Sequence, residues 1–190
     1  MHRTHLRRAG TAAFVALLLA PVACSSHPAS HPKAAASPQP PPGGGDFDID
    51  WDRPLQGGKV LASAADASSS IAFTPVVPKF STSPHVIEVD QGGLTVDQRA
   101  IAFAYDMPTL GKVVMVERKA PYSQDTLLGM ASNNSFGPGA YQVVSARGSK
   151  ALLIQGRGIG RLQWIEQGLL FDLYGESISP AAVQQLAAQV

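Results

Sequence analysis

The side chains that could support catalysis or metal binding are few. Residues 46–190 contain one histidine, His85, and the whole chain of 190 residues contains one cysteine, Cys24. His85 follows Pro84 at the start of an expected strand, where a histidine usually faces solvent or makes a structural hydrogen bond. Without a second histidine or cysteine, a zinc site would consist of carboxylates alone, which suit zinc poorly. We therefore predict no catalytic residue, no metal site and no cofactor.

Two further patterns are weak candidates for a catalytic or phosphate-binding site. Glu117 and Glu166 form a glycosidase pair only if their carboxyl groups lie at the right separation, which the sequence neither supports nor excludes. The glycine-rich run 156–160 would match a dinucleotide-binding loop only with a glycine at 161 and a helix after it. Arg161 occupies that position and a strand is expected to follow, so we interpret the run as a glycine-rich connection between strands.

Alternating acidic residues open the folded part of the chain. The carboxylates are Asp46, Asp48, Asp50 and Asp52, and the residues between them are apolar. An EF-hand loop starting at Asp46 would need glycine at 51 and glutamate at 57, where Trp51 and Gly57 stand. An extended arm that docks through its apolar face is the simpler interpretation, and a calcium ion with additional ligands from elsewhere is the alternative.

The first 23 residues have the pattern of an export signal. A basic start with Arg3, Arg7 and Arg8 precedes an apolar stretch, 12–20, that is too short to span a bilayer alone. Ala23 and Cys24 at its end resemble a bacterial lipobox, although Pro21 stands where an aliphatic residue is usual. We predict a lipoprotein signal peptide, residues 1–23, and lipidation of Cys24. The alternatives are a secreted protein with an incidental cysteine and an uncleaved N-terminal anchor.

Residues 24–45 are rich in proline, alanine, serine and glycine, a composition that cannot form a core and predicts a tether. Removal of the three arginines of the signal leaves 12 basic against 14 acidic residues, a net charge near −2. A near-neutral protein of this kind argues against nucleic acid as a partner. The lipidated N-terminus would attach the protein to the extracytoplasmic face of the cell membrane.

Residues 46–190 are long enough for one domain with a hydrophobic core. Short segments of alternating polarity predict strands at 85–90, 99–105, 112–118, 141–146 and 151–155. Helices are expected within 60–70, at 123–130 and at the C-terminus. The predicted class is α+β, an antiparallel meander with a short N-terminal helix and a C-terminal helix packed on one face, and we expect all the helices to cover that face.

The last thirty residues give the clearest local prediction. Two alternating runs flank Gln167-Gly168 and predict a β-hairpin, and Ser179-Pro180 predicts the start of a helix. The side chains expected to pack together are Trp164, Phe171, Leu173, Val183 and Leu186. Asp172 lies on the opposite face of its strand, where we expect a substitution to cost far less.

The motifs "L-x-W-x-x-x-G", "L-x-F-x-L-x-G" and "S-P" in this C-terminal stretch, with "ADASSSIAFTPVVPKF" at 65–80, resemble a domain of unknown function. That domain forms the extracytoplasmic end of some bacterial anti-sigma factors and of lipoproteins related to the outer-membrane lipoprotein-sorting group. The resemblance covers about residues 58–190. It implies a non-enzymatic interaction or sensing module of the cell envelope that binds another envelope protein. The alternatives are a carrier of a lipid or another apolar ligand between sheet and helices, and an envelope hydrolase.

Overall fold

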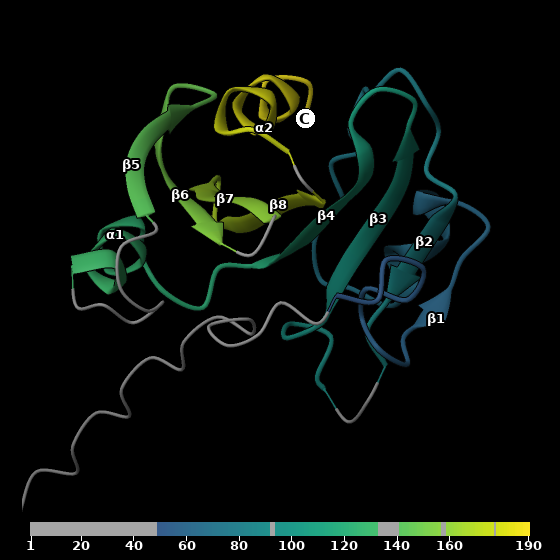
Figure 1. Cartoon of the computed structure of the whole chain (residues 1–190). Coiled ribbons are helices and arrows are strands. Elements are labelled where there is room, and N and C mark those ends of the chain that lie inside the picture. Colours follow the sequence, from purple (N-terminus) through teal and green to yellow (C-terminus); the bar gives the residue numbers. More distant parts are fainter. Residues whose placement is uncertain (1–48, 92–93, 133–140, 157–158, 177) are drawn as a thin grey trace, which may run out of the picture. The chain divides into compact units, whose positions relative to one another are not determined.

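A computed structural model describes residues 49–91, 94–132, 141–156, 159–176 and 178–190 (Figure 1). The predicted signal peptide, Cys24 and the tether lie outside the described residues. Within the part of the chain that is described, no helix is long and apolar enough to cross a membrane.

The domain is built on one eight-stranded antiparallel sheet with the strand order β1-β2-β3-β4-β8-β7-β6-β5. The strands are β1 (Lys59–Val60), β2 (Val86–Val89), β3 (Ala100–Met107), β4 (Gly111–Lys119), β5 (Tyr141–Ala146), β6 (Ser149–Gly156), β7 (Ile159–Glu166) and β8 (Leu169–Glu176). Two meanders of four strands each therefore meet where β4 pairs with β8. The predicted α+β class with an antiparallel meander is confirmed, and the C-terminal hairpin lies in the middle of the sheet.

Two of the hairpins close through two-residue turns, of which the one at Gln167-Gly168 was predicted from the sequence. Gln167 and Gly168 have φ values of 50° and 78°, and Arg147 and Gly148 have values of 52° and 82°. Positive φ at both central residues is the type I′ geometry, whose twist matches that of the flanking strands. The turns fix the register of β7 on β8 and of β5 on β6, and so decide which side chains share a face.

One face of the sheet, called the α2 face here, carries the main hydrophobic core. It is covered by α2 (Pro180–Ala187), by the 3-10 helix η1 (Ala64–Ser69) and by the segment 71–80. Ser179 accepts a hydrogen bond from the Ala182 N–H group and Pro180 is the first helical residue, as predicted. The five side chains predicted to pack together, Trp164, Phe171, Leu173, Val183 and Leu186, are buried in this core.

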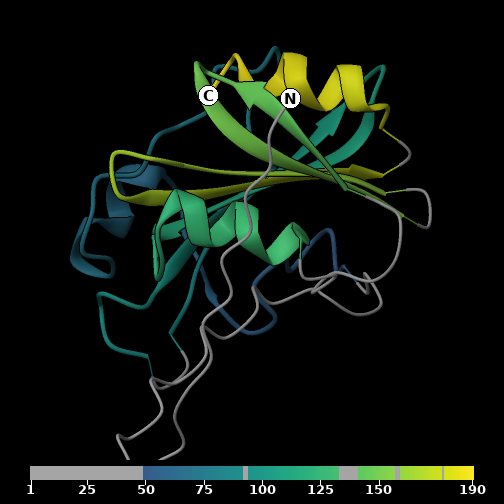
Figure 2. The ribbon, with the colours of Figure 1, turned by 90° about the vertical axis from the view of Figure 1, so that its left-hand side faces the viewer.

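The opposite face, called the α1 face here, is also covered. Helix α1 (Gln124–Ser132) packs Leu127 and Ala131 against β6 and β8. Figure 2 shows α1 and α2 on opposite sides of the sheet. The expectation that all helices cover one face is therefore wrong for α1, although η1 and α2 do share a face. The reason is the connection from β4 to the far edge of the sheet, because this connection carries α1 across the second face.

A pair of glycines allows the chain before α2 to approach the sheet closely. Gly160 and Gly175 lie opposite each other on β7 and β8, and Ile178 packs over them. A Cβ atom on Gly175 would lie 1.9 Å from Ile178 Cδ1. We expect Gly175→Ala to lower the free energy of unfolding by about 1–3 kcal/mol, because it overpacks the α2 face.

Urea denaturation checks this prediction, and Gly129→Ala in α1 is the matched control. A Cβ atom on Gly129 meets nothing within 4 Å, so this change should be neutral or stabilise the helix by up to about 1 kcal/mol. Equal effects of the two substitutions would show that Ile178 does not pack tightly on Gly175.

Candidate functional site

The segment 49–57 docks on the α1 face beside β2, β3 and β4. Ala102 and Ala104 on β3 are small, and they leave room for the side chains of Ile49, Trp51 and Leu55. The arm is not the extended strand that the alternation suggested, because residues 51–52 and 54–55 form turns. The docking of Ile49 and Trp51 is confirmed, and Phe47 lies outside the described residues.

A buried carboxylate fixes this arm. The side chain of Glu88 is fully buried and accepts hydrogen bonds from Arg53 Nε and from the Leu55 N–H group, both at 2.9 Å. Arg53 Nη2 also donates to the Gly58 carbonyl at 2.9 Å. Removal of Arg53 would leave a buried carboxylate without its charged partner, which is costly. The arm is therefore an integral part of the domain.

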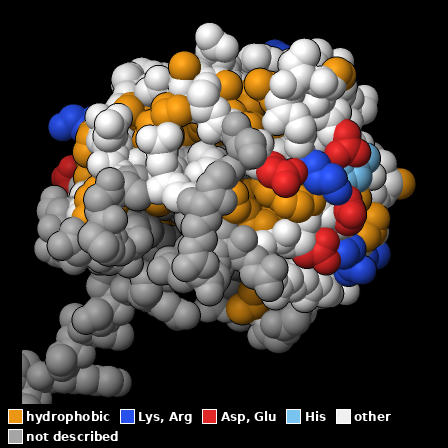
Figure 3. All heavy atoms as spheres, in the orientation of Figure 1, with side chains coloured by type: hydrophobic (Ala, Val, Ile, Leu, Met, Phe, Trp, Pro, Cys, Tyr) orange, Lys and Arg blue, Asp and Glu red, His pale blue; other side chains and the backbone are white. Residues whose placement is uncertain are grey.

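His85 belongs to a cluster of charges at the surface next to the arm (Figure 3). Its Nε2 atom lies 3.3 Å from Asp52 Oδ1 and its Nδ1 atom lies 3.6 Å from Asp106 Oδ2. Lys112 Nζ donates to the same Asp52 oxygen at 3.2 Å and holds the pKa of this carboxyl below its usual value. Both ring nitrogens of His85 face carboxylates, so the expected role as a hydrogen-bonded surface histidine is confirmed.

The described residues give no metal-binding geometry. They contain no group of three His, Cys, Asp or Glu side chains that could hold an ion. Asp50 Oδ1 accepts the N–H groups of Asp52 and Arg53 at 3.0 Å and so closes a local turn. Asp46 and Asp48, the other carboxylates of the calcium hypothesis, lie outside the described residues.

A buried polar network crosses the hairpin of β7 and β8 on the α1 face. Arg161 Nε donates to Asp172 Oδ1 at 2.7 Å, Arg161 Nη2 donates to Asp172 Oδ2, and Gln163 Nε2 donates to the same Oδ2 at 3.1 Å. Arg161 is 3% exposed and Asp172 is 6% exposed. The pKa of Arg161 is raised because the charge of Asp172 and its hydrogen bonds outweigh the opposing effect of burial.

This network corrects the expectation that Asp172 tolerates substitution. Asp172 does lie on the face opposite to Trp164, but that face is covered and not solvated. Truncation of Asp172 would leave the guanidinium of Arg161 buried without its counter-ion. The sequence carried one usable signal, because the two-residue turn at 167–168 places Gln163 opposite Asp172 and Arg161 one diagonal away.

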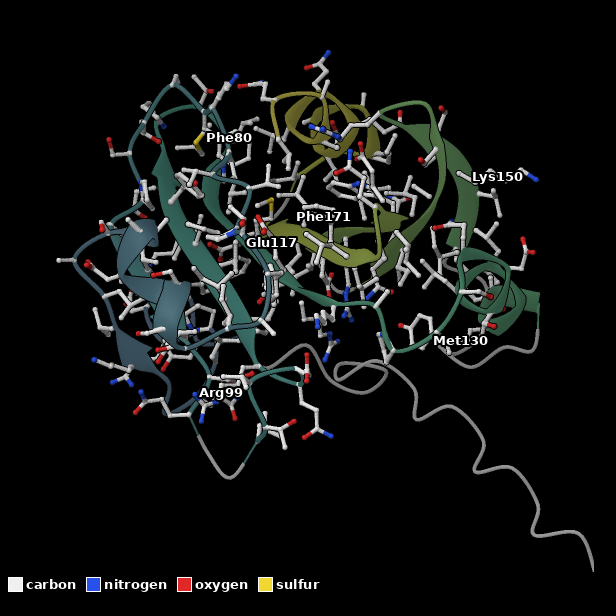
Figure 4. The ribbon with its side chains drawn as sticks, turned by 180° about the vertical axis from the view of Figure 1, so that it is seen from behind. Phe80, Arg99, Glu117, Met130, Lys150 and Phe171 are labelled. Atoms are coloured by element: carbon white, nitrogen blue, oxygen red, sulfur yellow. The ribbon has the colours of Figure 1, made fainter. Side chains whose placement is uncertain are left out.

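Among the described residues, one carboxyl group, that of Glu117, lies inside the main core. Glu117 on β4 is fully buried on the α2 face opposite Phe171 of β8, and the two residues lie close together in Figure 4. Its Oε2 atom accepts the Val76 N–H group at 2.9 Å, and so holds the segment 71–80 against the sheet. Burial raises the pKa of Glu117 to about 8. The carboxyl is therefore mainly protonated at neutral pH.

Three polar atoms in this core have no hydrogen-bond partner among the described residues. They are Glu117 Oε1, Tyr105 Oη and Trp164 Nε1. Trp164 stacks on Phe171 with ring centroids 5.0 Å apart and an interplanar angle of 8°. Burial of polar atoms without partners costs free energy, so these three atoms offset part of the stabilisation that the apolar core provides.

The two patterns named as weak catalytic candidates gain no support from the described residues. Strand β8 separates Glu117 on β4 from Glu166 on β7, and Glu166 pairs with Arg147 at 2.8 Å. Glu117 has no exposed area through which a substrate could reach it. The glycine-rich run connects β6, which ends at Gly156, with β7, which begins at Ile159. A strand follows the run, as predicted, and residues 157–158 lie outside the described part.

The exposed fractions of the side chains on the α2 face show whether there is space between them for an apolar ligand. A water-sized void beside a side chain would give that side chain accessible area. Yet the central side chains of this face have exposed fractions of 0–1%: Ile101, Phe103, Tyr105, Val113, Met115, Leu153, Leu162, Trp164, Leu173 and Val183. These side chains are packed against one another and against the covering segments.

Comparisons with known proteins add little to this description. No protein-family model matches the chain, and no curated protein matches it in sequence. A solved structure, described as a GTP binding regulator from Thermotoga maritima, matches with a TM-score of 0.36 and 11% sequence identity. The match covers 53% of this chain and 71% of the other chain. A likeness this weak carries no argument about function.

Proposed function

We propose that this protein is a lipid-anchored lipoprotein of the bacterial cell envelope whose domain is a non-enzymatic interaction or sensing module. The observation that carries the proposal is the placement of Cys24. It follows a basic and then apolar segment, and a proline-rich stretch without a folding pattern comes after it. The resemblance of residues 58–190 to the domain found on anti-sigma factors and envelope lipoproteins supports the same class.

The docked arm defines where the proposed tether would join the domain. Residues 24–45 would connect the membrane to an arm that Glu88 and Arg53 fix to the sheet. A tether of this composition spans on the order of 25–65 Å, depending on its stiffness. The domain would therefore stand clear of the membrane and present its surface to other envelope molecules.

The packing of the α2 face supports an interaction module over a carrier. A carrier of a lipid or another apolar ligand needs a concave apolar cavity between sheet and helices. The central side chains of the α2 face have almost no exposed area, so they leave no water-sized space for such a ligand. Interaction through the surface needs no internal cavity and is consistent with a filled core.

We expect Cys24→Ala to abolish membrane anchoring through lipid. Without the thiol no acyl chain can be attached, so the protein should appear in the soluble extracytoplasmic fraction or accumulate as an uncleaved precursor. Fractionation and gel mobility measure both outcomes. Ser25→Ala is the control, because it changes the neighbouring residue and keeps the cysteine. A Cys24→Ala variant that fractionates and migrates like the unmodified protein would contradict the proposal.

A further inference from the structure

The two edges of the sheet differ in how they are protected. Strand β1 at one edge has two residues, one of them Lys59. Strand β5 at the other edge has six residues, Tyr141–Ala146, with no charge, no proline and no glycine. Proteins usually protect edge strands with short length, charge or proline, because exposed backbone groups pair with other strands. Among the described strands, β5 lies at the unprotected edge.

The turn at 147–148 determines which backbone groups of β5 point away from the sheet. A two-residue hairpin closes on a pair that exchanges both backbone hydrogen bonds, here Ala146 with Ser149. Such pairs alternate along an antiparallel ladder, so Val144 and Gln142 also bond to β6. The N–H and C=O groups of Val143 and Ser145 therefore point outward. Val143 is also 56% exposed, the largest value among the exposed large hydrophobic residues.

We propose that two copies of this chain pair antiparallel through β5, with Val143 opposite Val143 of the second copy. A twofold axis at Val143 brings the outward-pointing N–H and C=O groups of Val143 in the two copies opposite each other, where the pair exchanges two backbone hydrogen bonds. Both copies then have Val143 on the same face of one continuous sheet, where β-branched pairs are favourable.

The charges around β5 favour a second copy as the partner. The strand itself is uncharged, so self-pairing places no like charges opposite each other. Arg147 lies beyond one end of the strand, so the two Arg147 residues lie at opposite ends of the paired strands. Lys150 lies on β6 opposite Ser145, on the side of β5 away from the second copy. Arg147 also pairs with Glu166 of its own chain at 2.8 Å. The twofold arrangement closes on itself and gives a dimer rather than a fibre.

Disulfide trapping tests both the pairing and its register. The experiment uses the full chain in detergent with Cys24→Ser, so that an introduced cysteine is the only thiol. With Val143→Cys, the two thiols meet at the twofold axis, within the reach of a disulfide. With Ser145→Cys, the two cysteines lie four residues apart along the paired strands, about 14 Å, which is too far.

We expect Val143→Cys to form a covalent dimer at least about ten-fold faster than Ser145→Cys under mild oxidation, because only the first pair meets the distance limit. Adding Ser145→Pro to the Val143→Cys chain should slow its cross-linking, since this proline removes an outward N–H group and no bond to β6. Val60→Lys on the opposite edge should leave the cross-linking rate unchanged. Equal rates for the two cysteine variants, or no covalent dimer with Val143→Cys, would overturn the proposal.

Discussion

Glu117→Gln should raise the free energy of unfolding relative to that of the wild-type protein. This difference should grow by about 4 kcal/mol from pH 5 to pH 9. The reason is the buried position of the carboxyl, which raises its pKa from 4.5 to about 8 in the folded protein. Between these two values the folded protein binds a proton at Glu117 and the unfolded chain does not. The contribution of Glu117 to the free energy of unfolding therefore falls as the pH rises between these values, by about 1.4 kcal/mol per pH unit.

Glutamine removes this titration and keeps most of the local structure. Its carbonyl oxygen has the shape of the carboxyl and can still accept the Val76 N–H group that Glu117 Oε2 accepts. Urea denaturation of both proteins at pH 5, 7 and 9 measures the difference. Glu176→Gln removes a charge from an exposed position and controls for the change in net charge. A difference that stays constant from pH 5 to pH 9 would show that Glu117 is not a buried acid.

Trp164→Ala and Asp172→Ala should each lower the free energy of unfolding by about 3–5 kcal/mol, for different reasons. Trp164 is fully buried and stacks on Phe171, so its truncation leaves a cavity on the α2 face. Asp172 is the counter-ion of the buried Arg161, and its truncation leaves that charge uncompensated on the α1 face. Against a typical total of about 5–15 kcal/mol, either change brings the domain close to unfolding.

Asp97→Ala is the matched control for the aspartate. Asp97 pairs with Lys119 at 2.5 Å, but its side chain is 65% exposed, so the pair should contribute at most about 1 kcal/mol. Urea melts of the three variants compare the buried pair, the buried aromatic and the surface pair. An Asp172→Ala variant as mild as Asp97→Ala would mean that the α1 face is solvated at β8.

Local features of the fold could be predicted because they depend on neighbouring residues. Ser179 and Pro180 specify the start of α2, and Gln167-Gly168 specifies the turn between β7 and β8. Alternation likewise places Trp164 and Phe171 on one face of that hairpin. In each case the cause lies within a few residues of its effect, so no knowledge of the distant chain is needed.

The long-range arrangement could not be predicted in the same way. Nothing in β4 or β8 alone shows that these two strands pair, because the choice depends on where the connection through α1 takes the chain. The position of α1 then decides that the second face is covered. The burial of Asp172 follows from that coverage, which is why its role was missed.

The burial of Glu117 could be predicted from the sequence only in part. The pattern of β4 places it on the same face as Val113 and Met115, so its position toward the core was visible in the alternation. Its full burial depends on the segment 71–80, whose Val76 N–H group bonds to it from 41 residues away. The pairing of Arg53 with Glu88 is similar, since the arm and β2 are 35 residues apart.

The intact mass of the protein extracted from its own membrane tests the proposed anchoring most directly. The proposal predicts a chain that begins at Cys24 and carries the added mass of a lipid on that residue, since a lipobox is cleaved before its modified cysteine. Tandem fragmentation would place the added mass on the N-terminal residue. A chain that begins at another residue, or a Cys24 of unmodified mass, would contradict the account.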